Sequence, residues 1–347
     1  MSTFAIIPWS DSFAQDRMFD VDSEVNRDYL IEPYLEMKLE FERLGHEIHT
    51  IDYYVNYDYV DYFLFFTLDW DIYKKLVSLK RDDSLVYCTA EPPSVYRYNS
   101  PAGYRILKHI FPYILTWNDD WVDNKSIFKR NLPYYFIDQT DGNLPFEEKK
   151  LITFISGDKC SGYPGELYSE RRKAINYFET NHPDQFDFFG AGWDENVHKC
   201  YKGKCESKAE VFHKYRFAIC FENIEGLNGY ITEKILDCLE SGIVPIYAGA
   251  PNIEEIIPKE CFINYRRFDS FSELYEYISS IDKATFDSYL HEAKSFISTA
   301  ADCFSGSCYA HFIIDSIRQK KVFKSSFWAY KYFQWRYIQS FTNKLFR

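Results

Sequence analysis

The chain has 347 residues and a formal net charge of −12; 46% of its residues are hydrophobic and 20% are aromatic. This composition excludes a disordered protein, and the acidic balance excludes a general nucleic-acid binder, because phosphate contacts need clustered Lys and Arg. The N-terminus has no basic segment followed by a long apolar stretch, and no uncharged run reaches the roughly 18 residues of a spanning helix, so we expect a cytoplasmic protein.

The first half of the chain alternates short apolar runs with helical periodicity. Strands are predicted at 4–9, 46–52, 61–66, 84–90 and 113–117, and helices at 27–44, 71–81 and 102–110. Such alternation predicts a parallel sheet covered by helices on both faces. The Pro-, Gly- and charge-rich segment 133–150 is the predicted linker.

The same pattern restarts after this linker. Strands are predicted at 151–156, 186–190, 217–223 and 242–251, with helices at 166–179, 209–215 and 229–241. The length also favours two domains. We therefore predict an α/β protein of two Rossmann-like domains facing a cleft, with limits 1–148 and 149–318, followed by a basic aromatic tail at 319–347.

The stretch GYITEKILDCLESGIVPIYAGAP, residues 229–251, carries the strongest chemical signal. On a helix, Tyr230, Glu233, Lys234 and Asp237 fall on one stripe, which is typical either of a solvated face or of a binding site. The flanking strands are predicted to be parallel, so Asn223 and the helix N-terminus meet at the sheet edge where ligands bind. A helix N-terminus and a lysine favour phosphate, a carboxylate favours hydroxyls, and the pattern predicts a nucleotide-sugar site.

Three consecutive motifs, FEN at 221–223, YITEK at 230–234 and VPIYAGAP at 244–251, resemble the donor-binding signature of the α-1,3/4-fucosyltransferases, glycosyltransferase family 10. The resemblance covers most of 85–281 and implies a GT-B architecture. It implies that GDP-fucose is bound by these residues: Asn223, Tyr230, Glu233 and Lys234, with the lysine on the diphosphate.

The resemblance also implies a phosphate-binding arginine in the first helix of the second domain. Arg171 and Arg172 are the two candidates, and the apolar spacing in SERRKAINYF favours Arg171 without deciding between them. The alternative for either residue is a solvated first helical turn.

Glu91 lies in YCTAEPPS, at the end of a predicted strand of the first domain. This stretch resembles the family's strand ending in Glu-x-Pro-Ser, whose glutamate is taken as the general base. The alternative is a strand-end carboxylate before a proline turn.

The activity that the resemblance implies is inverting transfer of L-fucose from GDP-β-L-fucose to O3 or O4 of an N-acetylglucosamine-containing oligosaccharide acceptor. We expect no metal and no other cofactor. The alternatives are a transferase of another GDP-sugar and a non-catalytic nucleotide-sugar-binding protein.

Two further patterns have structural alternatives. Asp69–Asp71 forms a D-x-D that can bind Mn²⁺ but equally suits a helix N-cap. Cys200, Cys205, Cys303 and Cys308 can together ligate Zn²⁺, although free thiols are the favoured interpretation.

The C-terminal segment has the opposite charge to the rest of the chain. Residues 316–347 contain no acidic side chain, and 318–347 interleave eight Lys or Arg with ten aromatics. This pattern suits a helix lying on an anionic membrane surface, here the inner face, and equally suits a helix that packs back on the first domain.

Overall fold

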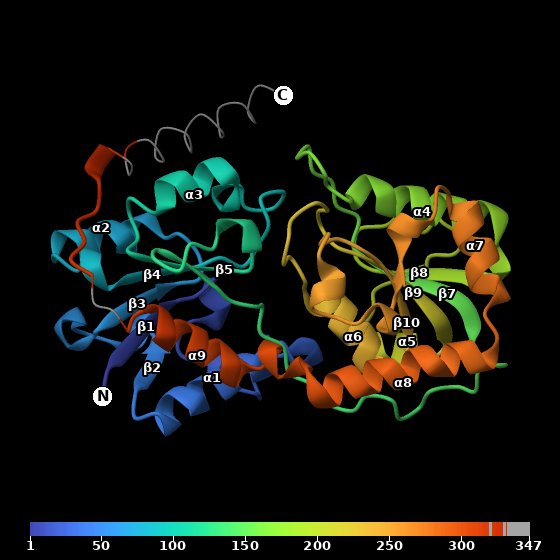
Figure 1. Ribbon diagram of the computed structural model, residues 1–347, viewed down its shortest axis with the longest axis horizontal. Coiled ribbons are helices and arrows are strands. Elements are labelled where there is room, and N and C mark those ends of the chain that lie inside the picture. Colours follow the sequence, from blue (N-terminus) through green and yellow to red (C-terminus); the bar gives the residue numbers. More distant parts are fainter. Residues whose placement is uncertain (319–320, 329–330, 332–347) are drawn as a thin grey trace. The chain divides into compact units, whose positions relative to one another are not determined.

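The computed structural model describes residues 1–318, 321–328 and 331, which form two compact units (Figure 1). Unit 1 contains Met1–Arg130 together with the described residues from Gly306 onward, and unit 2 contains Asn131–Ser305. Each unit is built around its own parallel sheet.

The first sheet has the strand order β2-β1-β3-β4-β5-β6, and each described pair of neighbours is parallel. Its side chains alternate between faces: Phe4 and Ile6 pack with α1 and α9, whereas Ala5 and Ile7 pack with α2 and α3. The elements of unit 1 are β1 (Thr3–Ile7), α1 (Glu32–Arg43), β2 (Glu47–Thr50), β3 (Tyr62–Phe65), α2 (Trp70–Ser78), β4 (Leu85–Cys88), α3 (Pro101–Leu107), β5 (Tyr113–Thr116), β6 (Ile127–Lys129) and α9 (Gly306–Ser316).

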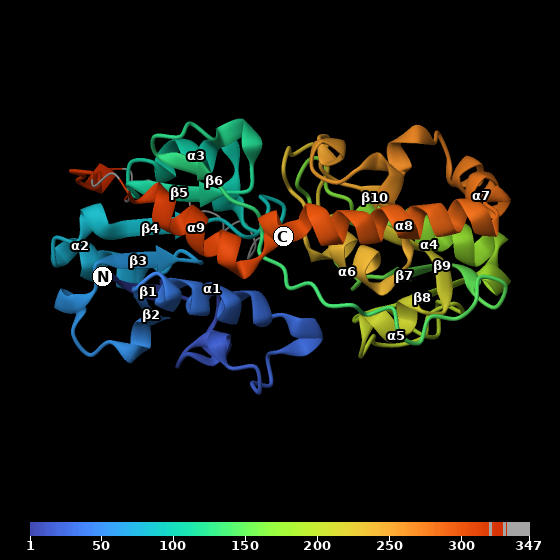
Figure 2. The ribbon, with the colours of Figure 1, turned by 60° about the horizontal axis from the view of Figure 1, so that its bottom comes forward.

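The second sheet has the order β11-β10-β9-β7-β8 and is also parallel (Figure 2). Ala218 and Cys220 of β9 face α5 and α6, whereas Phe217 and Ile219 face α4 and α7. The elements of unit 2 are β7 (Lys150–Ile155), α4 (Tyr168–Asn181), β8 (Phe186–Phe189), α5 (Lys208–Phe212), β9 (Tyr215–Phe221), α6 (Glu233–Ser241), β10 (Val244–Ala248), β11 (Ile263–Asn264), α7 (Phe271–Ser280) and α8 (Lys283–Thr299).

The units have different limits from the predicted domains 1–148, 149–318 and 319–347. Residues 131–148 belong to unit 2, because the Tyr134 hydroxyl donates to Asp237 (2.9 Å) and Glu240 (2.7 Å). Helix α9 instead returns to unit 1 and packs beside α1. Gly306 permits this packing, since a Cβ there would lie 1.9 Å from the Pro33 carbonyl oxygen.

Most of the predicted tail, 319–347, lies outside the described residues. The described part packs within unit 1: Lys321 Nζ donates to the Pro112 carbonyl (2.8 Å), and the Ser326 amide donates to the His109 carbonyl (2.9 Å). Among the described residues, no helix is both long enough and apolar enough to cross a bilayer.

Candidate functional site

The candidate site lies at the carboxyl edge of the second sheet, where β7 and β9 are neighbours although β8 separates them in sequence. Connections leave this point in opposite directions, which opens the crevice where doubly wound sheets bind ligands. Ser156 follows β7, Glu222 and Asn223 follow β9, and the first turns of α4 and α6 begin at the same edge.

A buried carboxylate fixes the start of α6. Glu222 is fully buried, and its two carboxylate oxygens accept from the Thr232 amide and the Thr232 hydroxyl, both at 2.9 Å. Thr232 is also the N-cap of α6, since its hydroxyl accepts from the Lys234 amide (3.4 Å). Burial raises the pKa of Glu222, and the nearby Lys234 opposes that rise.

The Lys234 ammonium lies in the first turn of α6 among oxygen acceptors. Its Nζ is 3.1 Å from both Thr232 Oγ1 and Glu233 Oε1, and 3.5 Å from Glu222 Oε2. Desolvation lowers its pKa, but the two carboxylates outweigh that effect and raise it above its ordinary value. Lys234 is therefore a firmly protonated cation held at a helix N-terminus, while Glu233 is half exposed beside it.

Arg171 is a second cation at this edge. It is 5% exposed, and its Nη2 donates to the Phe221 carbonyl (2.5 Å) and to Asn223 Oδ1 (3.1 Å). Its buried Nε has no hydrogen-bond partner among the described residues. Burial lowers the pKa of Arg171 and Glu222 opposes this, yet a guanidinium stays protonated in proteins. Arg171 is also close enough for its charge to lower the pKa of Lys234.

Asn223 connects Arg171 to Tyr230. Its Oδ1 accepts from Arg171, and its Nδ2 donates to the Tyr230 hydroxyl (3.4 Å). Tyr230 is buried, and its carbonyl accepts from the Tyr247 hydroxyl (3.3 Å). The arginine, the amide and the phenol thus form one polar chain across the ends of β9 and α4.

Four of the predicted residues therefore gather here with Glu233 beside them: Arg171, Asn223, Tyr230 and Lys234. Arg172 does not join them, because it is half exposed and forms an ion pair with Asp158 (Nη2 to Oδ1, 2.6 Å).

The predicted helical stripe was wrong in two respects. Helix α6 begins at Glu233, so Tyr230 lies before it and reaches the site through an extended segment. Asp237 is buried and accepts from Tyr134 and from Lys208 Nζ (2.6 Å), so it serves packing.

Sequence reasoning missed three residues at this edge. The first two are Glu222 and Thr232, whose two hydrogen bonds we call the Glu222–Thr232 clamp. The third is Arg266, whose Nη2 donates to the Gly249 carbonyl (2.8 Å) beside the end of β10. Glu222 directly follows an apolar strand, and Thr232 directly precedes the apolar helical pattern, so both had a detectable signal.

Glu91 lies in unit 1, in the loop that follows β4, with an exposed side chain. Buried side chains hold the backbone of this loop in place. Asn99 accepts from the Tyr87 hydroxyl (2.9 Å) and donates to the Glu91 carbonyl (2.5 Å). Trp117 Nε1 donates to the neighbouring Ala90 carbonyl (2.9 Å). The backbone at Glu91 is therefore fixed while its carboxylate reaches the surface.

The other candidate sites have structural roles. Asp69 is the N-cap of α2 and accepts from the amides of Asp71 and Ile72, both at 2.9 Å, as the N-cap interpretation predicted. None of the nine cysteines, all of which lie among the described residues, forms a disulfide. Within the part of the chain that the structure describes, no group of three or more His, Cys, Asp or Glu side chains is arranged to hold a metal ion.

Comparison with known proteins identifies relatives of both the sequence and the fold. Residues 165–327 match the family described as glycosyltransferase family 10 (fucosyltransferase), C-terminal part. The alpha-(1,3)-fucosyltransferase FucT of Helicobacter pylori is 37% identical over 90 residues, 26% of this chain and 17% of that protein. The 4-galactosyl-N-acetylglucosaminide 3-alpha-L-fucosyltransferase 9 of Mus musculus is 25% identical over 197 residues, 55% of this chain and 49% of that protein. The aligned parts thus span less than two thirds of these relatives.

Solved structures share this fold. The crystal structure of an alpha1,3-fucosyltransferase matches 94% of this chain and 92% of that chain with a TM-score of 0.59 and 16% identity. The crystal structure of an alpha1,3-fucosyltransferase with GDP-fucose matches with a TM-score of 0.58, 16% identity and coverage of 94% and 93%. The predicted fold class, two Rossmann-like domains of the GT-B architecture, is confirmed.

Replacing Thr232 with Val preserves the side-chain size but removes the hydroxyl that serves Glu222 and caps α6. We expect the free energy of unfolding to fall by about 2 kcal/mol, because a buried carboxylate oxygen loses its donor and the helix loses its cap. Burial raises the pKa of Glu222. The loss of stability is therefore largest at pH values above this raised pKa, where Glu222 is ionised, and it becomes smaller as the pH falls through it. Urea unfolding of Thr232→Val beside Thr232→Ser, which keeps the hydroxyl, measures the difference; equal stability of the two variants would contradict the clamp.

Proposed function

Because this chain belongs to glycosyltransferase family 10, we propose that it is an inverting fucosyltransferase, moving L-fucose from GDP-β-L-fucose to O3 or O4 of an N-acetylglucosamine-containing glycan. One observation carries the proposal: two cations, Arg171 and Lys234, meet beside the N-terminus of α6 within the family's own motif residues.

The donor is proposed to bind in unit 2 with its diphosphate at these cations. A diphosphate gains from the helix N-terminus, from the Lys234 ammonium and from the Arg171 guanidinium. Asn223 and Tyr230 supply neutral polar groups next to the arginine, and the half-exposed Glu233 can accept from sugar or ribose hydroxyls. Between the two candidate arginines, burial and the contact with Asn223 favour Arg171.

The proposed reaction is a single displacement. The acceptor hydroxyl oxygen forms a bond to C1 of fucose while the bond from C1 to the β-phosphate oxygen breaks, so the β-linkage of the donor becomes an α-linkage. The bonding electron pair leaves with GDP, whose added charge Lys234 and Arg171 stabilise. The hydroxyl proton passes to Glu91, whose exposed carboxylate stands on a fixed backbone. No step in this scheme requires a divalent metal.

Two other functions make different demands on these residues. A transferase of another GDP-sugar would use the same diphosphate contacts and differ only in the sugar it accepts. A non-catalytic nucleotide-sugar-binding protein would have no use for a positioned carboxylate at Glu91.

The first test separates the two arginines by GDP binding. Arg171→Lys should weaken GDP affinity at least tenfold, because a lysine cannot reproduce the fork that contacts Asn223 and the β9 end, and charged hydrogen bonds are worth about 1.5–3 kcal/mol. Arg172→Lys, the matched control, should bind within about threefold of the original chain. Calorimetric titration measures both, with thermal unfolding to verify folding. The reverse ranking would reassign the phosphate contact to Arg172.

The second test concerns the base. Glu91→Gln should lower transfer from GDP-fucose by at least about a hundredfold, because general base catalysis contributes roughly that much or more, while GDP-fucose affinity stays unchanged. The exposed Glu276→Gln on α7 is the control and should transfer normally. Each assay includes EDTA, in which the original chain should keep its rate. Near-native turnover by Glu91→Gln would show that Glu91 is not the general base. Loss of transfer in EDTA would show that the reaction needs a divalent metal.

The third test concerns location. We propose that the chain acts in the cytoplasm and attaches to anionic membrane through its C-terminal end, since 329–347 contain four basic and seven aromatic residues. Truncation after Trp328 keeps the contacts of Ser325 and Ser326 with unit 1. The truncated chain should no longer sediment with vesicles containing phosphatidylserine, whereas the full chain should. Equal sedimentation of both would reject the membrane contact.

A further inference from the structure

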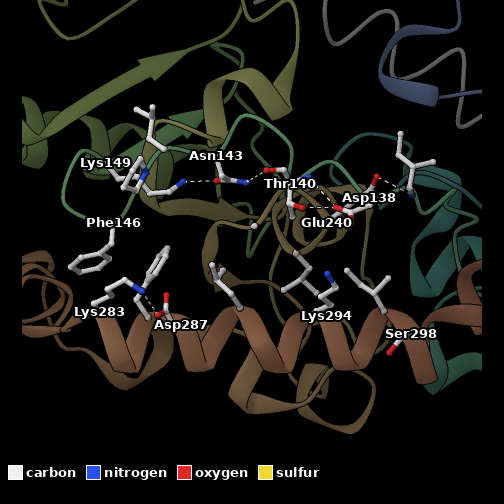
Figure 3. Close-up of a pocket in the computed structure, with 18 of the residues that line it drawn as sticks. Asp138, Thr140, Asn143, Phe146, Lys149, Glu240, Lys283, Asp287, Lys294 and Ser298 are labelled. Atoms are coloured by element: carbon white, nitrogen blue, oxygen red, sulfur yellow. Dashed lines mark hydrogen bonds and ion pairs between the residues drawn. The ribbon is translucent and has the colours of Figure 1, made fainter.

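Unit 2 contains a cavity of about 550 Å³ that is separate from the candidate donor site (Figure 3). The segment 136–149 and the C-terminal end of α6 form one wall, and α8 forms the other. The cavity adjoins Glu240 and Gly242, at the opposite end of α6 from Lys234. Its volume falls in the range of about 300–1,000 Å³ that is typical of small-molecule sites.

Most of the cavity surface is apolar. Aliphatic and aromatic side chains from both walls line it: Leu144, Phe146, Leu239, Phe286, Leu290 and Ile297. A sugar or nucleotide would lose hydrogen bonds to water here without replacing them, so these walls select a ligand with an apolar body.

Lys149 is the unusual polar group of this cavity. It is 6% exposed, and its Nζ donates to Asn143 Oδ1 (2.6 Å) and to the His213 carbonyl (2.8 Å). Both acceptors are neutral, and no ion pair joins this ammonium to a carboxylate among the described residues. Desolvation lowers the pKa of Lys149 to about 8. Burying a cation without a counter-charge costs desolvation free energy. When Lys149 is protonated, two of its three N–H groups donate to Asn143 and His213, and the third can donate to a bound anion.

The cavity is also lined by Asp138, Glu240, Lys283, Asp287 and Lys294, and three of these groups limit the charge of that anion. Glu240 already accepts from Tyr134, from the Ile137 amide and from Gln139 Nε2. Lys283 is ion-paired with Asp287. The carboxylate of Glu240 repels further negative charge, so a monoanion fits better than a phosphate dianion.

We propose that this cavity binds a small amphiphilic carboxylate, with its apolar body between α8 and the segment 136–149 and its carboxylate against Lys149. The ligand would supply the negative charge that the protein does not place beside this buried ammonium. The site stands on the cavity and on Lys149 alone and does not depend on the proposed transfer reaction.

Decanoate is a suitable probe, with decan-1-ol as the neutral molecule of the same length. Calorimetric titration of the full chain should give one saturable decanoate site and at least tenfold weaker binding of decanol. Lys149→Met should lower decanoate affinity at least tenfold and leave decanol unchanged. Leu290→Trp, which adds volume to the α8 wall and leaves Lys149 in place, should abolish saturable binding of both probes.

Thermal unfolding verifies that each variant is folded, and Leu290→Trp decides the question if Lys149→Met fails to fold. Equal binding of decanoate and decanol by the original chain would overturn the role of Lys149. Decanoate binding that survives Leu290→Trp, or no saturable binding at all, would overturn the site. Because donor binding is measured independently, failure here and failure of the proposed transferase function give different results.

Discussion

Glu222 is a carboxylate with no access to solvent, so the protein must compensate its charge internally. Thr232 does this by donating two hydrogen bonds from the first residue before α6. The end of β9 and the start of α6 are thereby joined, and the same hydroxyl contacts the Lys234 ammonium. The position of Lys234, the direction of the helix N-terminus and the neighbouring Asn223 all depend on this one buried contact.

The same clamp balances the charges at the sheet edge. Lys234 and Arg171 carry two positive charges, and Glu222 and Glu233 carry two negative ones when ionised. Two cations this close would repel each other and destabilise the fold without those carboxylates. A diphosphate that bound here would therefore have to compete with the Glu222 and Glu233 carboxylates for contact with the Lys234 ammonium. In the proposed complex, the diphosphate would gain in this competition from the helix N-terminus and from donors such as the Arg171 Nε, which lacks a partner among the described residues.

The sequence predicted the elements whose causes are local. Alternating apolar runs predicted both parallel sheets, and Asp69 before a helical pattern predicted its N-cap. Arg171 and Arg172 were left open because adjacent helical residues differ by about 100°, and the choice depends on partners distant in sequence, Asn223 and Asp158. Long-range packing also explains the misassigned Asp237, which the segment at Tyr134 covers.

Helix α9 has a consequence for how the polypeptide is made. Tyr309, Ala310 and Ile313 complete a core that also contains Phe4 and Met37 from the other end of the chain. On the ribosome, the residues of unit 1 up to Arg130 emerge first, and α1 can already pack on this face of their sheet, yet its β5–β6 side lacks the cover of α9 until residues past 306 have been translated. Unit 2 is contiguous and can close earlier. Until then, the nascent N-terminal part exposes the apolar surface that α9 later covers.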